Sequence, residues 1–147
     1  MRENMGLYRG KRAKNGSWVE GPLLFVEGEP AIFDINDPER SAVWSYGDAR
    51  LWGALPVIPE TVGQFTGMPD KKGKLIFEGD IVRIDDNVKK TFPQVEDGDV
   101  RFSRGCFFVG SYGDILRSLD VIADYRGVFR GEVIGNIHDN PELLKEE

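Results

Sequence analysis

The stretch GKLIFEGDIVRI, residues 73–84, places two acidic residues on either side of Gly79, between two apolar runs. Glu78 and Asp80 at this spacing suggest a metal site, an acid–base pair or a turn. A hard cation needs a loop that wraps several oxygen ligands, and no DxDxDG-like run is present. Gly79 adopts backbone geometries that other residues resist, and aspartate bonds nearby backbone amides. We therefore predict a structural turn, which involves Gly73, Glu78, Gly79 and Asp80 and leads into the strand DIVRI.

Turn residues divide most of the chain into short segments of alternating apolar residues. Eighteen glycines and eight prolines are more than a helical bundle needs. Residues 23–34 predict a hairpin with a two-residue II′ turn at Gly28-Glu29. Pro30 cannot donate a ladder hydrogen bond, so this hairpin is expected at a sheet edge. Further hairpin turns are predicted at 68–74, where Asp70 and Gly73 fit a type I turn and a left-handed glycine, and at 103–105, with strands over 42–46, 80–84 and 131–137.

Three segments depart from this pattern. In residues 113–125 the apolar positions Ile115, Leu119 and Ile122 recur four and three apart, which predicts a short helix capped by Asp114. Asn140 before Pro141 is a favourable start for a terminal helical turn. The polar residues 85–99 predict a long mobile loop.

Charge and cysteine content limit the classes of function. A net charge of −6 argues against a general polyanion binder, because such affinity comes from lysine and arginine contacts to phosphates. Residues 1–19 nevertheless carry five basic side chains against Glu3 alone. The single cysteine excludes an intramolecular disulfide, and no apolar run approaches the length of a membrane span. The basic start has no apolar core behind it, so we expect no signal peptide and a cytoplasmic protein without a membrane partner.

Candidate catalytic groups are few. Cys106 and His138 form a conceivable nucleophile pair, oriented by Asp139 or Asn140. Cys106 is flanked by phenylalanines in a predicted strand, however, where a buried thiol behaves as a small hydrophobic group. No phosphate-binding glycine motif opens a helix and no GxSxG elbow exists, so we expect no cofactor, no metal and no catalytic residues.

Aromatic and basic residues gather in the first 52 positions. They form a stacking surface for single-stranded nucleic acid or for a peptide, or else they fill a small core. We take the following residues as the candidate interaction surface: Arg9, Lys11, Arg12, Trp18, Trp44 and Trp52.

Four motifs occur in a fixed order along nearly the whole chain: YRGKR at 8–12, ETVGQFTG at 60–67, DKKGKLIFEGDIV at 70–82 and EVIGNIHDNPELL at 132–144. Together they closely resemble the YopX family, small proteins found mainly in bacteriophages and in prophages of Gram-positive bacteria. The resemblance implies a mostly β protein with a compact, barrel-like C-terminal half. It implies no established activity, and residues 85–99 lie where such proteins are expected to vary.

These observations predict a mostly β chain of two small packed lobes with one or two short helices. The N-terminal β lobe covers 1–66, and 67–147 resembles a small SH3-like barrel; together they form one YopX-like domain. Alternating residues of the barrel are expected to fill its core, namely Ile81, Val100, Phe102, Phe108, Val133 and Ile137. The leading hypothesis is a non-enzymatic phage or prophage accessory module, acting through a protein partner or as a homo-oligomer. The alternative is nucleic-acid binding by the N-terminal basic and aromatic strip, and an enzyme is the third.

Overall fold

The computed structural model describes residues 6–36, 54–110 and 116–144. Within these ranges the chain is mostly β with two short α-helices, which confirms the predicted fold class. It divides into two compact units, Arg2–Phe65 and Thr66–Glu147 with Met1. The predicted strand at 42–46 lies outside the described residues.

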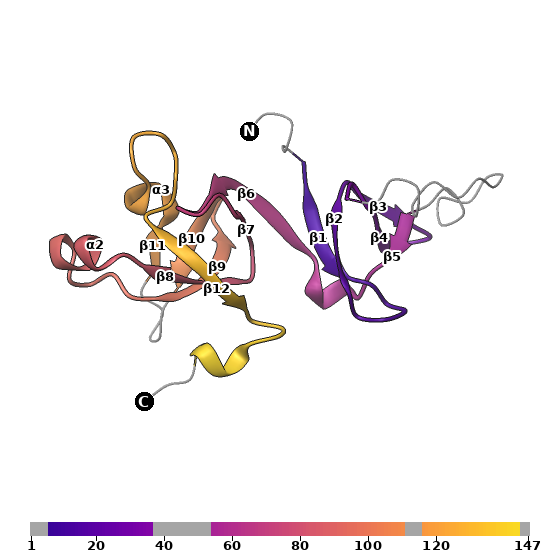
Figure 1. Cartoon of the computed structure of the whole chain (residues 1–147). Helices are drawn as coiled ribbons and strands as arrows, with labels where there is room; N and C mark the ends of the chain where they lie inside the picture. Colours follow the sequence, from indigo (N-terminus) through magenta and orange to yellow (C-terminus); the bar gives the residue numbers. More distant parts are fainter. Residues whose placement is uncertain (1–5, 37–53, 111–115, 145–147) are drawn as a thin grey trace. The chain divides into compact units, whose positions relative to one another are not determined.

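The N-terminal unit begins with the antiparallel pair β1 (Tyr8–Lys11) and β2 (Trp18–Gly21) (Figure 1). A second sheet has the order β3-β4-β5, and Val19, Ile32 and Val57 form the centre of the core. The remaining elements are β3 (Leu23–Val26), β4 (Glu29–Phe33), β5 (Ala54–Pro56), the 3-10 turn η3 (Pro59–Thr61) and the start of β6 (Gly63–Pro69).

The turn of the β3-β4 hairpin differs from the prediction. Glu27 and Gly28 both have positive φ angles, 54° and 83°, so the turn is a type I′ turn one residue earlier than expected. In the sheet order of the described residues the hairpin lies at an edge, as expected, but the edge strand is β3, and Pro30 itself lies in the central strand β4. Pro30 faces Phe25 across the ladder, and its carbonyl accepts a hydrogen bond from the Val57 amide at 3.2 Å.

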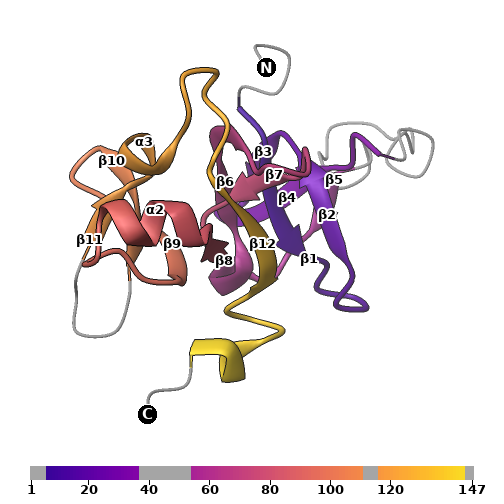
Figure 2. The same cartoon turned by 60° about the vertical axis from the view of Figure 1, so that its left-hand side comes forward.

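The C-terminal unit contains a curled five-stranded antiparallel sheet of order β11-β10-β9-β8-β12 (Figures 1 and 2). A tight turn at Arg104-Gly105, where both φ angles are positive, joins β9 and β10. The elements are β7 (Leu75–Phe77), β8 (Asp80–Ile84), α2 (Asp86–Thr91), β9 (Gly98–Ser103), β10 (Cys106–Gly110), β11 (Leu116–Ser118), α3 (Leu119–Ile122), β12 (Gly131–Asn136) and the 3-10 turn η4 (Pro141–Leu144).

The core of this unit is larger than the alternation predicted. It contains Ile76, Val82, Ile84, Val88, Val95, Val100, Val109, Leu119, Ile122 and Phe129. Ile81 and Val100 are buried as expected, and Phe108, Val133 and Ile137 are half-buried. The prediction that Phe102 is buried is wrong. Its side chain is 48% exposed near the hairpin tip, where its ring packs on Phe107 with centroids 4.9 Å apart.

The predicted mobile loop at 85–99 is wrong. The segment forms α2, and its two valines, Val88 and Val95, are buried in the core. Asp97 accepts a hydrogen bond from the Ile84 amide at 2.8 Å and pairs with Lys89 at 2.9 Å. Two buried valines and the contacts of Asp97 therefore hold a segment whose other residues are mostly polar.

The start of the helix predicted over 113–125, including its cap Asp114, lies outside the described residues, and the helix is shorter than expected in the rest. Residues before it pair as β11, and α3 comprises only Leu119–Ile122, with the Ser118 hydroxyl accepting from the Asp120 amide. Strand pairing with β10 satisfies the backbone that a longer helix would have used. At the C-terminal end, η4 follows Asn140, whose side chain accepts from the Asn136 amide at 3.2 Å.

Candidate interaction surface

Part of the basic and aromatic strip forms a cluster on β1 and β2. The register places Lys11 opposite Trp18, and the Lys11 Nζ lies 5.5 Å from the indole centroid. The Arg9 guanidinium carbon lies 4.8 Å from the same centroid, in cation–π geometry. Arg9 is only 7% exposed, so its charge is largely covered.

The other members of the strip are placed apart from this cluster or cannot be placed. Arg12 follows β1 in an isolated bridge to Val57 and is half-buried. Trp44 and Trp52 lie outside the described residues. The structure thus brings together three of the six predicted residues, of which Lys11 and Trp18 remain partly exposed.

Strand β3 carries a surface that the sequence reading missed. Phe25 is 67% exposed and Leu24 is 38% exposed, on a strand at the end of the β3-β4-β5 order. The sequence predicted a hairpin over 23–34 but no exposed apolar surface on its first strand. The only available signal was the four consecutive apolar residues, which leave an apolar side chain on each face of the sheet.

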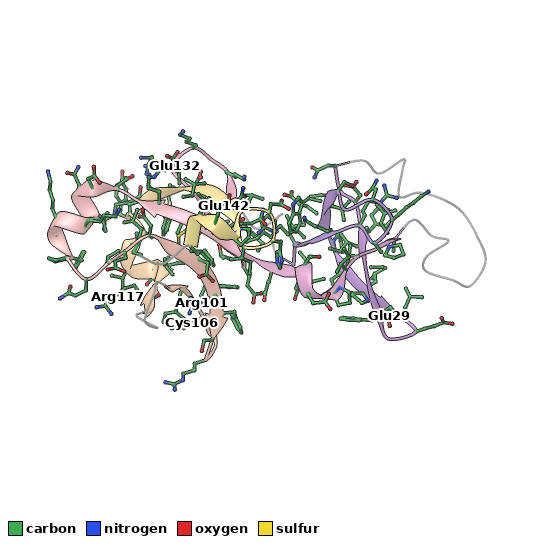
Figure 3. All side chains as sticks on the ribbon, turned by 90° about the horizontal axis from the view of Figure 1, so that it is seen from below. Glu29, Arg101, Cys106, Arg117, Glu132 and Glu142 are labelled. Atoms are coloured by element: carbon green, nitrogen blue, oxygen red, sulfur yellow. The ribbon has the colours of Figure 1, made fainter. Side chains whose placement is uncertain are left out.

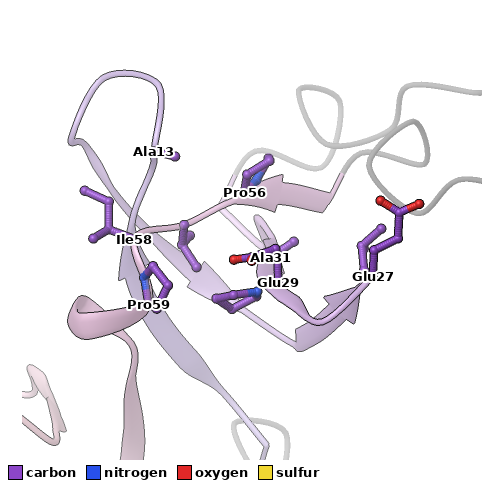
Figure 4. A pocket seen from close by; sticks show the side chains of 10 residues that line it. Ala13, Glu27, Glu29, Ala31, Pro56, Ile58 and Pro59 are labelled. Atoms are coloured by element: carbon purple, nitrogen blue, oxygen red, sulfur yellow. The ribbon is translucent and has the colours of Figure 1, made fainter.

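A groove lies on one face of the same sheet (Figure 4). Its volume is about 370 Å³, and aliphatic and proline side chains from 13, 26–31 and 56–59 make up most of its lining. Glu27 and Glu29 are the two charged residues in that lining, which draws only on the described residues. The groove therefore combines an apolar floor with negative charge.

The acidic residues of 73–84 lie at a bend between β7 and β8. Gly79 has a φ of 93°, and its amide and carbonyl bond Val100 and Ile137, each at 2.9 Å. The buried Asp80 carboxylate accepts a hydrogen bond from the Phe77 amide at 2.8 Å. Glu78 is half-buried between them. The Gly79 contacts join the bend to β9 and to the residue that follows β12, and the Asp80 contact closes the bend on the end of β7.

Asp70 has a more extensive role than the predicted turn required. One carboxylate oxygen accepts from the Lys72 and Lys74 amides, and the other accepts from the Val133 amide, all at 2.9 Å. Gly73 completes the turn with a φ of 86° and a hydrogen bond to the Asp70 carbonyl. A single buried carboxylate therefore ties the 70–74 hairpin to β12, a connection that sequence spacing does not reveal.

A surface network of charges surrounds Glu132 (Figure 3). Its carboxylate pairs with Lys72 at 2.8 Å and with Arg83 at 3.5 Å. The hydrogen bond from Lys72 lowers the pKa of Glu132 below its ordinary value of 4.5. Nearby, the hydrogen bond to Asp85 at 2.7 Å raises the pKa of Lys71. Because charges of both signs pair with one another, this network resembles a solvated surface more than a ligand site.

The structure separates the two members of the conceivable thiol pair. Cys106 is exposed at the start of β10, so its expected burial is wrong. His138 follows β12, and β9 and β8 lie between these strands in the sheet. Three strand spacings amount to about 14 Å along the sheet. In the described ranges no group of three or more histidine, cysteine or acidic side chains is arranged to hold a metal ion.

Comparisons with known proteins place this fold in a family. The crystal structure of protein EF1440 from Enterococcus faecalis is similar, with 26% sequence identity and a TM-score of 0.53, over 96% of this chain and 99% of that one. No curated protein sequence matches the chain. None of the described helices has the length and apolar character needed to cross a membrane. The sequence profile described as YopX protein matches residues 7–145, and the chain therefore belongs to the YopX family.

Proposed function

We propose that the chain is a non-enzymatic protein-interaction module, an accessory protein of a phage or prophage that acts in the cytoplasm of the bacterial host. The observation that carries this proposal is the exposed apolar surface of β3, formed by Leu24 and Phe25. A large aromatic side chain left in water costs free energy that a protein partner recovers when it covers the ring. The phage or prophage setting is supported by the motifs shared with the YopX family.

The position of β3 suits recognition by another chain. A strand at the end of a sheet presents backbone groups to which a further strand adds, and its side chains supply specificity. In the sheet order of the described residues β3 is such a strand. Phe25 and Leu24 point to opposite faces of the sheet, so one partner segment contacts apolar surface on both sides. The partner is a host or phage protein, or a second copy in a homo-oligomer.

Replacing both side chains tests this proposal. For Leu24→Thr combined with Phe25→Ser we expect about a tenfold loss of captured partner, because buried aromatic anchors carry much of the energy of an interface. The measurement is affinity capture from induced cells, with light scattering after size exclusion to detect self-association. Tyr125→Ser is the matched control, because Tyr125 is 97% exposed in the other unit. A strictly monomeric chain that retains no partner would contradict the proposal.

Nucleic-acid binding is the second candidate, favoured by the pairing of Lys11 with Trp18. The burial of Arg9 and the net charge of −6 argue against nucleic-acid binding. If it holds, fluorescence polarisation with labelled single- and double-stranded oligonucleotides should show affinity that falls as salt rises. Lys11→Gln should then weaken binding and reduce the salt slope by about one. An absent or salt-independent signal would remove this mechanism.

A further inference from the structure

The register of the β3-β4-β5 sheet builds the floor of the groove. Val26 lies opposite Glu29, and Ala31 lies opposite Pro56. Cross-strand partners share a face, and residues two apart on one strand do so as well. Val26, Glu29, Ala31 and Pro56 therefore project from the same face, while Ile32 projects into the core on the other.

The walls of the groove are held by backbone pairing. The Ala13 amide donates to the Pro56 carbonyl at 2.9 Å, and the Val57 amide donates to the Pro30 carbonyl at 3.2 Å. Prolines at 30, 56 and 59 contribute rigid rings without amide donors. A ligand therefore meets a largely apolar, preformed surface. The groove has a volume of about 370 Å³, which falls within the usual range for small binding sites.

Charge distinguishes this groove from a simple apolar patch. Glu29 shares the face of Ala31, two residues further along β4, and Glu27 stands at the hairpin turn (Figure 4). Within the described part of the chain, Glu29 has no salt-bridge partner. A carboxylate beside apolar surface favours a cationic ligand group, because a lysine or arginine forms a charge-assisted hydrogen bond there. It disfavours phosphates and acidic peptides by repulsion.

We propose that the groove binds an extended peptide segment of a partner protein. An aliphatic or proline side chain of the peptide packs on Val26, Ala31 and Pro56, and a neighbouring lysine or arginine pairs with Glu29. This inference rests on the proposed interaction function and names the chemistry of the partner. The groove lies beside the β3 surface, because Leu24 lies opposite Ala31.

Selection of peptides on the full-length protein tests the inference without a known partner. The probe is a phage-displayed random heptapeptide library, followed by titration of the enriched synthetic peptides. We expect the enriched peptides to combine a lysine or arginine with an aliphatic residue or proline. Glu29→Gln should weaken the best peptide about tenfold, because it replaces an ion pair with a neutral contact. Ala13→Trp, a change at an exposed position in the lining, should fill the groove and remove binding.

Glu142→Gln is the matched control, since it removes the same charge from an exposed position in the C-terminal unit (Figure 3). It should leave peptide affinity unchanged. Selection of no peptides, or of peptides without a basic residue, would overturn the inference, as would affinity that is insensitive to Glu29→Gln. Self-association abolished by Ala13→Trp would assign the groove to a second copy and would also overturn it. The double variant Leu24→Thr and Phe25→Ser tests the β3 surface separately. If it loses the captured partner while Glu29→Gln and Ala13→Trp retain it, the groove is not the binding site and the proposed function still stands.

Discussion

Replacing Phe129 with alanine is expected to lower the free energy of unfolding by about 3–5 kcal/mol. Phe129 is fully buried in the C-terminal core, together with Ile76, Val82 and Ile122. Truncation removes the transfer free energy of the ring and leaves a cavity that the surrounding strands fill only in part. Urea unfolding followed by circular dichroism measures the change as a lower midpoint.

The control for this prediction is Tyr125→Ala. Tyr125 lies four residues before Phe129 but is 97% exposed, so its truncation should change the stability by less than about 0.5 kcal/mol. Equal losses from the two variants would show that burial does not govern stability in this unit. A loss below about 1 kcal/mol for Phe129→Ala would contradict the position of this ring in the core.

Asp70→Ala is expected to lower the free energy of unfolding by about 3 kcal/mol, the second largest effect. The substitution removes the acceptor of three backbone amides, those of Lys72, Lys74 and Val133. Unsatisfied buried donors are costly, and the Val133 amide lies in the half-buried strand β12, where it bonds the buried Asp70 carboxylate. The same unfolding experiment measures the loss, and hydrogen exchange should show faster exchange at Val133.

Asp70→Asn separates hydrogen bonding from side-chain size. Its amide oxygen still accepts from Lys72 and Lys74, but its NH₂ group replaces the acceptor that faces the Val133 amide. Asp70→Asn should therefore lower the free energy of unfolding by less than Asp70→Ala does. If alanine has no measurable effect, or asparagine is worse than alanine, the assigned hydrogen-bond network is wrong.

The sequence locates the bends at 70–74, 78–80 and 103–105 correctly because their chemistry is local, although it misplaces the turn at 27–28 by one residue. Gly73, Gly79 and Gly105 all adopt positive φ angles at bends between strands. Asp70 and Asp80 bond amides within a few residues. Such contacts depend on residues close in the chain, so composition and spacing are sufficient to locate them.

Predictions that depended on distant contacts were less successful. Val88 and Val95 stand in a polar segment, and only the core that they enter explains why 85–99 is ordered. Phe102 follows the alternation of β9 but lies beyond the end of the core. Tertiary packing decides both outcomes, and a local pattern contains no information about where the core ends.

The candidate interaction surface shows the same contrast between features set by local contacts and features set by distant contacts. The sequence placed Lys11 and Trp18 on one candidate surface, but the hairpin of β1 and β2 that brings them together was not predicted. The groove depends on segments near 13, 30 and 57, which approach one another only when the unit is folded. The burial of Arg9 also depends on the fold, because its position in the sequence beside other basic residues indicated an exposed charge.

The most direct test of the account is hydrogen–deuterium exchange of the full-length chain, measured with and without its captured partner. We expect new protection over residues 22–33 and 54–59, which contain β3, β4, β5 and most of the groove lining. Exchange at the structural bends of 70–84 should remain unchanged. Protection confined to the C-terminal unit would contradict the claim that the N-terminal unit carries the interaction surface.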